Sequence, residues 1–161
     1  MSKAFTKEDA AADEVVVPPR APLPDGVPNY VTPRGLELLR TERQALELAR
    51  AALRDGADAA RLNALAARLF ELERRIASAQ CVEPQPGGAA VVRFGSRVTL
   101  LDEAGSEQRY QIVGVDEAEP SSGKIAFLSP LAKALLGAQV GDSVRLEKPG
   151  RPRELEVLAI E

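Results

Sequence analysis

Two aspartates, Asp55 and Asp58, flank a glycine in the stretch L-R-D-G-A-D-A-A-R-L at residues 53–62. Mg²⁺ is usually held in proteins by one or two carboxylates and keeps several of its waters. A metal held in this way can stabilise the attacking and leaving oxygens of a phosphoryl-transfer reaction. The alternative interpretation is structural, with Asp58 as the N-cap of a helix and Asp55 as a turn residue. Which interpretation holds depends on the elements that carry the two acids.

The composition excludes several classes of function. The 161 residues include no His and one Cys, Cys81, so His-based triads, His metal sites and an intrachain disulfide are excluded. The net charge of −3 offers no global electrostatic basis for nucleic-acid binding. No apolar run approaches the ~18 residues of a membrane span, and the N-terminus lacks the apolar core of a signal peptide. We expect a cytoplasmic monomer with no membrane contact.

Residues 1–29 are predicted to be a disordered tail. Four acids come first, and the prolines that follow disfavour both helix and strand. The acids are Glu8, Asp9, Asp13 and Glu14, and the prolines are Pro18, Pro19, Pro22, Pro24 and Pro28. We interpret this segment as a passive tether, with a functional tail as the alternative.

Residues 30–82 are predicted to form an antiparallel coiled-coil hairpin. Thr32 is a suitable N-cap and Pro33 suits the first helical position, so the first helix should run to about Arg54. The second helix should begin near Asp58, and the short connection around Gly56 makes the helices antiparallel. Apolar residues follow a coiled-coil spacing on both helices. They are Leu39, Leu46 and Leu53 on the first, and Leu62, Leu65, Leu69, Leu72, Ile76 and Ala79 on the second.

Residues 83–161 are predicted to form a small α+β domain. The segment E-P-Q-P-G-G at 83–88 ends the helical pattern, and short β-branched or alternating runs follow it. One short helix, at about 130–136, interrupts these runs, which indicates a domain built on an antiparallel sheet. The predicted strands are 91–94, 97–101, 108–113, 124–127, 144–147 and 154–160.

Three motifs resemble the GreA/GreB family of bacterial transcript-cleavage factors. They are N-Y-V-T-P-R-G at 29–35, A-Q-C-V at 79–82 and L-S-P-L-A-K-A-L-L-G-A-Q-V-G-D-S-V at 128–144. The opening M-S-K-A-F-T-K-E and the Pro-rich tail resemble the GreB branch in particular. The resemblance covers nearly the whole chain, and the Ser-Pro-Leu-Ala segment is its most specific part.

The resemblance implies a partner and a mode of action. Members of this family bind RNA polymerase, with an FKBP-like C-terminal domain at the rim of the secondary channel, which places docking on Ser129, Pro130 and Leu131. The helical hairpin enters the channel and comes near the nascent RNA. Two acids at its tip help to hold a Mg²⁺ shared with the polymerase, which then cleaves its own backtracked RNA. Such a protein is an accessory factor with no cofactor of its own, not an enzyme.

The tip and the hairpin length depart from the family pattern Gly-Asp-x-x-Glu-Asn. Arg61 stands three residues after Asp58, where the motif has an acid, and Asp55 precedes the glycine. Each arm is about nine residues shorter than the family's arms, which at ~1.5 Å per helical residue withdraws the tip by ~13 Å. The shortened hairpin also resembles that of Rnk, a Gre-like polymerase-binding protein. Leu128 replaces a polar residue that the family has before the Ser-Pro pair.

Because the two acids are out of register with the family motif and the arms are short, we favour the structural interpretation of Asp55 and Asp58.

Arginines recur along both predicted helices. They could line the polymerase channel or contact RNA, or they could form a solvated face with partners such as Arg43–Glu47. These arginines are Arg43, Arg50, Arg54, Arg61 and Arg68.

Three functions remain: a polymerase-binding regulator that does not support cleavage, a cleavage stimulator that uses Asp55 and Asp58, and a peptidyl-prolyl isomerase. The last is disfavoured because Phe94, Tyr110 and Phe127 are too few aromatics for its pocket.

Overall fold

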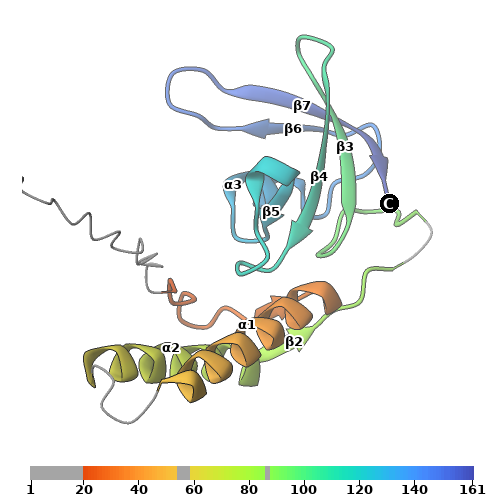
Figure 1. The fold of residues 1–161 in the computed structure, drawn as a ribbon. Helices are drawn as coiled ribbons and strands as arrows, with labels where there is room; N and C mark the ends of the chain where they lie inside the picture. Colours follow the sequence, from red (N-terminus) through yellow and green to blue (C-terminus); the bar gives the residue numbers. More distant parts are fainter. Residues whose placement is uncertain (1–19, 54–58, 86–87) are drawn as a thin grey trace, which may run out of the picture.

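The computed structural model describes residues 20–53, 59–85 and 88–161. Figure 1 shows a helical hairpin lying against one end of a sheet-based C-terminal unit. This confirms the α+β class and the order of its parts. No described helix is long and apolar enough to cross a membrane. The division of the chain at residues 29 and 82 stays a prediction.

The hairpin consists of α1 (Pro33–Ala52) and α2 (Ala59–Ala77). The helix begins as predicted, because Thr32 Oγ1 accepts the Gly35 N–H at 2.9 Å and Pro33 occupies the first position. Both helices direct leucines inward, and the buried set is Val31, Leu39, Leu46, Leu69 and Leu72. The prediction that Asp58 caps α2 falls on residues outside the described ones.

A short parallel ribbon closes the base of the hairpin. Strand β1 (Asn29–Val31) pairs with β2 (Ala79–Cys81), and the Val82 N–H extends the pairing to the Val31 carbonyl at 2.9 Å. The ribbon joins the segment before α1 to the segment after α2. It therefore holds the start of α1 and the end of α2 side by side. We did not predict these strands, because three residues are too few to show a periodicity.

The C-terminal unit contains a five-stranded sheet in the order β5-β4-β3-β7-β6. Its elements are β3 (Arg97–Asp102), β4 (Glu107–Val113), the 3₁₀ turn η1 (Pro120–Ser122), β5 (Lys124–Ala126), α3 (Pro130–Leu135), β6 (Ser143–Leu146) and β7 (Arg153–Ile160). The sheet is antiparallel except at its β4–β5 edge, which is parallel. These elements correspond to the predicted runs with one exception.

The run at 91–94 is not a strand. The Val92 N–H donates to the Ala138 carbonyl at 2.8 Å, and the Val92 carbonyl accepts the Gly137 N–H at 2.9 Å. These bonds attach the run to the turn after α3 instead of to a sheet edge. Val92 itself is buried in the core of the unit, with residues such as Leu100, Ile112 and Leu135. The apolar run therefore indicated burial correctly and strand structure wrongly.

Candidate functional site

Polar side chains connect the hairpin to the sheet unit at the junction between them. Glu117, which is 6% exposed, accepts a hydrogen bond from the Thr32 hydroxyl at the start of α1. Lys124 Nζ lies 3.8 Å from the other carboxylate oxygen of Glu117. A Cβ on Gly35 would lie 2.8 Å from Glu117 Oε2, so glycine lets the carboxylate reach the first turn of α1 without a shift of the Glu117 side chain. The start of α1 is thus bound directly to the loop after β4.

Four charged residues form a second part of the junction, which we call the charge cluster: Arg20, Glu42, Arg75 and Asp116. The Arg20 guanidinium donates to Asp116 and to Glu42, and Arg75 Nε lies 3.3 Å from Asp116 Oδ2. Arg75 also donates to the Ala21 carbonyl. The Asp116 and Arg75 side chains are only 10% and 8% exposed. The cluster therefore connects the segment before β1, both helices and the sheet unit through largely buried charges.

Electrostatics stabilise the charged form of Arg20. Burial alone would lower the pKa of this guanidinium, but the hydrogen bond from Arg20 to Glu42 and the charge of Asp116 outweigh it. The pKa of Arg20 is therefore held above its ordinary value. Arg20 stays ionised in this site, and its two carboxylate partners favour that state.

An aromatic trio forms the apolar part of the junction. Tyr30 from β1 packs against Phe94 and Phe127 of the sheet unit, and each pair of ring centroids lies 5.7 Å apart. Such tilted and edge-on pairs are favourable beyond the area that they bury. A Cβ on Gly114 would lie 2.6 Å from the Tyr30 carbonyl oxygen, so glycine allows the β1 backbone to approach the end of β4.

Most of the motif N-Y-V-T-P-R-G is thereby explained. Asn29 Nδ2 donates to the Arg75 carbonyl at 2.8 Å and so caps the end of α2, and the residues after it supply the contacts described above. Analysis of the sequence missed the charge cluster and Glu117. The only signal was an acidic pair, Asp116 and Glu117, three residues after the end of β4. Nothing in the sequence linked this pair to residues in the first half of the chain.

The hairpin arginines occupy two different environments. Arg43 and Arg50 continue the 3-4 spacing of Leu36, Leu39 and Leu46, which is the spacing of the helix–helix seam. Arg43 is half-buried there, whereas Arg50, near the end of α1, is exposed. Arg43 Nε is buried and lies 3.5 Å from Glu47 Oε1, which confirms the predicted pair.

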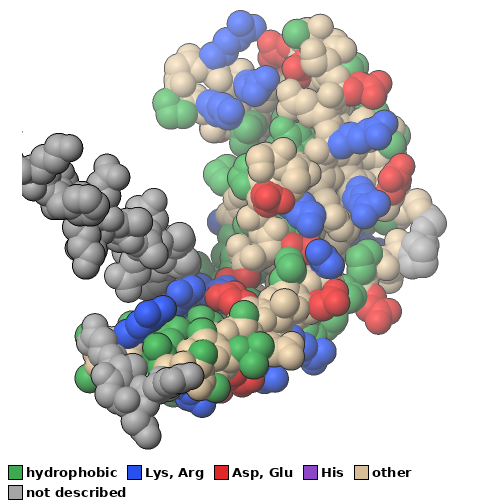
Figure 2. All heavy atoms as spheres, viewed as in Figure 1, with side chains coloured by type: hydrophobic (Ala, Val, Ile, Leu, Met, Phe, Trp, Pro, Cys, Tyr) green, Lys and Arg blue, Asp and Glu red, His purple; other side chains and the backbone are tan. Residues whose placement is uncertain are grey.

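On α2, Arg61 is exposed and Arg68 is half-buried. Figure 2 shows Arg side chains (blue) beside apolar ones (green) along the hairpin. Arg54, Asp55 and Asp58 lie outside the described residues.

The predicted docking segment forms the start of α3. Ser129 Oγ accepts the Ala132 N–H at 3.2 Å, and Pro130 is exposed at the first helical position. Leu131 and Leu128 are half-buried and pack against the core of the sheet unit. The residues that remain available to a partner at this end include Pro130, Leu136 and Val140, of which the last two are 40% and 59% exposed.

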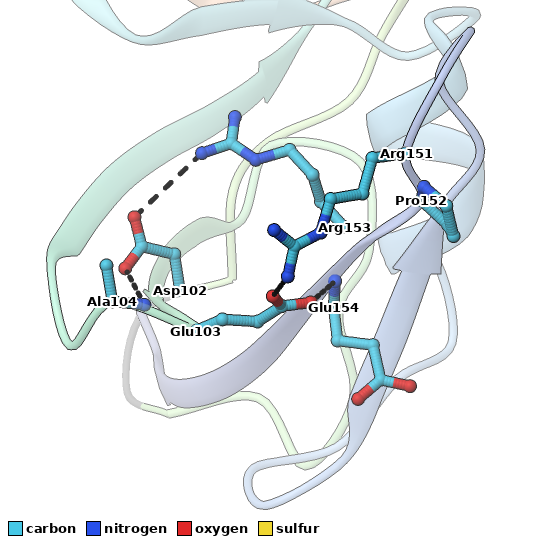
Figure 3. Close-up of a pocket in the computed structure, with 7 residues that line it drawn as sticks. All are labelled: Asp102, Glu103, Ala104, Arg151, Pro152, Arg153 and Glu154. Atoms are coloured by element: carbon cyan, nitrogen blue, oxygen red, sulfur yellow. Dashed lines mark hydrogen bonds and ion pairs between the residues drawn. The ribbon is translucent and has the colours of Figure 1, made fainter.

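A shallow pocket of 290 Å³ lies between the β3–β4 turn and the β6–β7 loop. Figure 3 shows Arg151 pointing toward Glu103 and Arg153 toward Asp102, whereas the Glu154 side chain points away from them. Arg151 lies 2.9 Å from Glu103, and Arg153 lies 3.9 Å from Asp102. Asp102 also accepts the N–H groups of Ala104 and Ser106, as in a tight turn. These pairings join two loops and leave little free charge for a ligand. No group of three metal-ligating side chains occurs among the described residues.

Known proteins resemble this chain in sequence. The transcription elongation factor GreA of Acidiphilium cryptum (strain JF-5) is 44% identical over 94 residues, which make up 58% of this chain and 60% of that protein. GreA of Sinorhizobium medicae (strain WSM419) is 41% identical over 95 residues, with the same coverage. The crystal structure of Thermus aquaticus Gfh1 is 30% identical, covers 82% of this chain and 97% of that one, and has a TM-score of 0.41. The chain thus spans about 60% of the length of the curated relatives it matches.

The fold and the junction define an α+β protein in which a helical hairpin is bound to one end of a five-stranded sheet unit. The profile described as "Transcription elongation factor, GreA/GreB, C-term" matches residues 87–161, which include the whole sheet. Together with the identity to the GreA proteins, this match shows that residues 87–161 form a C-terminal domain of the GreA/GreB family. The family prediction from the three motifs is confirmed. The likeness to Rnk stays a prediction.

Proposed function

We propose that this protein is a bacterial RNA polymerase-binding elongation regulator that acts at the secondary channel in the cytoplasm. The family membership and the names of the relatives, transcription elongation factors, support this proposal. In it the sheet unit docks through Ser129, Pro130 and Leu131, and the hairpin enters the channel. The protein is then an accessory factor, and any RNA cleavage is carried out by the polymerase.

The observation that carries the proposal furthest is the length of the hairpin. Its helices have only 20 and 19 residues, so the longer one spans about 30 Å at 1.5 Å per residue. Contacts between Mg²⁺ and carboxylates are about 2.1 Å long. The comparison of arm lengths implies that the tip ends on the order of 10 Å short of the metal. Side chains cannot span such a gap. We propose that the hairpin occupies the channel without stimulating cleavage and competes there with longer cleavage factors.

The hairpin arginines have a role in this proposal. Arg50 and Arg61 are exposed, so they are available to acidic groups of the channel or to phosphates of backtracked RNA. Arg43 and Arg68 contribute less, because they are partly buried along the hairpin. Arg54 completes the predicted set near the tip. Such contacts add to docking of the sheet unit and do not amount to independent RNA binding.

Two other functions compete with this one. A cleavage stimulator would use Asp55 and Asp58 to hold a Mg²⁺ shared with the polymerase, as the resemblance to the transcript-cleavage factors implies. A peptidyl-prolyl isomerase is disfavoured further by the packing, because the rings of Phe94 and Phe127 contact Tyr30 instead of lining an open pocket. The regulator and the cleavage stimulator differ in one measurable property, the rate at which the polymerase shortens backtracked RNA.

The test uses purified RNA polymerase stalled in a backtracked complex with labelled RNA and Mg²⁺. We expect the protein to bind, to leave the rate of transcript shortening unchanged, and to inhibit an added cleavage factor in proportion to its concentration. Faster shortening that is lost in Asp58→Ala, but not in the matched control Asp25→Ala, would establish the stimulator instead. Asp25 is an exposed aspartate outside the hairpin. Failure to bind the polymerase would exclude both functions.

A further inference from the structure

The segment of residues 20–28 contacts both units although it contains neither helix nor strand. Figure 1 shows it, in red, running beside the hairpin toward β1. Val27 packs against the core of the sheet unit, and the Ala21 carbonyl accepts a hydrogen bond from Arg75 of α2. The segment, called the N-terminal segment below, also lines a cavity of 510 Å³ together with Glu71, Arg74 and Arg75 of α2. This part of the predicted tether is therefore packed against the protein.

Covalent connectivity alone does not orient the hairpin on the sheet unit. After α2 and β2 the chain reaches β3 through residues 82–96, which contain no described strand or helix. The orientation must therefore come from contacts across the junction. Three sets of contacts are present: the aromatic trio around Tyr30, the Thr32–Glu117 bond, and the charge cluster.

Within the charge cluster, the Arg20 side chain is the one that contacts both α1 and the sheet unit. One terminal nitrogen of its guanidinium donates to Asp116 of the sheet unit and the other to Glu42 of α1. A planar guanidinium can serve two carboxylates at once, whereas a lysine ammonium acts as a single point charge. Without Arg20 the cluster has two carboxylates and one cation, Arg75, so the approach of α1 to the sheet unit would bring uncompensated negative charge together.

We propose that Arg20 is a positioning residue that holds the helical hairpin in one orientation relative to the sheet unit. The N-terminal segment is then a third connection between the units, in addition to the chain itself and the β1 contacts. This inference concerns the protein alone. Its consequence for polymerase binding rests on the proposed function: if the competent orientation falls to about one tenth of the population, apparent binding weakens about tenfold.

The test measures the distance between spin labels on the two units by pulsed electron–electron double resonance. The labels are placed at Gln44→Cys on α1 and Ser106→Cys on the β3–β4 turn, both exposed, in a Cys81→Ser background. We expect one narrow distance distribution in the parent protein. In Arg20→Ala that distribution should broaden or shift, while circular dichroism shows unchanged helix content. Arg20→Lys should restore it only in part.

Arg34→Ala is the matched control. Arg34 is also an arginine in an ion pair, with Glu37 at 3.6 Å, but both side chains are exposed and lie on α1 alone. Its distribution should equal that of the parent. Glu42→Gln, which removes the charge of the Arg20 partner on α1 and keeps its shape, should broaden the distribution as Arg20→Ala does, and it decides the matter if Arg20→Ala unfolds. An unchanged narrow distribution in Arg20→Ala, or in Glu42→Gln where that variant decides, would overturn the proposal whether or not the protein binds polymerase.

Discussion

Thr32 and Glu117 lie 85 positions apart in the sequence, yet the Thr32 hydroxyl donates a buried hydrogen bond to the Glu117 carboxylate. The oxygen of the same hydroxyl accepts the Gly35 N–H at 2.9 Å and so caps α1. One side chain thus starts the hairpin and binds it to the sheet unit. The predictions below follow from this junction, from the hairpin seam and from the end of α3.

Replacing Thr32 by valine should destabilise the protein by about 2–4 kcal/mol. The loss of an N-cap costs about 1 kcal/mol, and a buried carboxylate that loses its donor adds about 1–3 kcal/mol. Thr32→Ser keeps the hydroxyl and should cost less than half as much. Urea unfolding followed by circular dichroism measures both variants. A loss in Thr32→Ser as large as that in Thr32→Val would contradict the prediction, because it would show that the methyl group matters as much as the hydroxyl.

Gly114→Ala should destabilise the junction although the residue has no left-handed backbone. The added Cβ would lie 2.6 Å from the Tyr30 carbonyl oxygen, a backbone atom that cannot rotate away. Overpacking of this kind costs about 1–3 kcal/mol. We expect a lower thermal midpoint and loss of the near-ultraviolet signal of Tyr30. Gly105→Ala, where nothing lies within 4 Å but φ is +81°, separates steric contact from backbone strain. A near-ultraviolet spectrum unchanged in Gly114→Ala would contradict the prediction.

Arg43→Leu should stabilise the hairpin, because Arg43 stands on the seam between Leu39 and Leu46. An apolar side chain there would extend the buried leucine cluster and contribute about 1 kcal/mol. Arg40→Leu is the control, since Arg40 is exposed on α1 away from that cluster. Differential scanning calorimetry should show a higher midpoint for the first variant only. A decrease for Arg43→Leu would mean that its pair with Glu47 outweighs the apolar packing.

Pro130→Ala should weaken polymerase binding and leave stability unchanged. Pro130 is exposed at the first position of α3, whose cap by Ser129 does not depend on it. The loss of a contact worth about 1.4 kcal/mol corresponds to about tenfold in affinity. Pro120→Ala is the matched control, because Pro120 is also exposed at the first position of a short turn, η1. Fluorescence anisotropy with labelled protein gives both affinities. Equal affinities would remove Pro130 from the docking surface.

Much of the architecture was predictable because it depends on short-range patterns. The coiled-coil leucines predicted both helices of the hairpin, and the Thr-Pro pair predicted the start of α1. Alternating runs predicted five of the strands within one or two residues. The run at 91–94 was misassigned because a short apolar run shows burial but not which partner its backbone finds.

The sequence by itself determined the family, the helical hairpin and the α+β class, since these follow from motifs and from periodicities within one element. Only the tertiary structure decided what the motif N-Y-V-T-P-R-G does, namely bind the hairpin to the sheet unit. It also decided that Arg20, within the predicted tether, bridges Glu42 and Asp116. The physical reason is that contacts between two units depend on their relative orientation, which no local pattern of residues encodes.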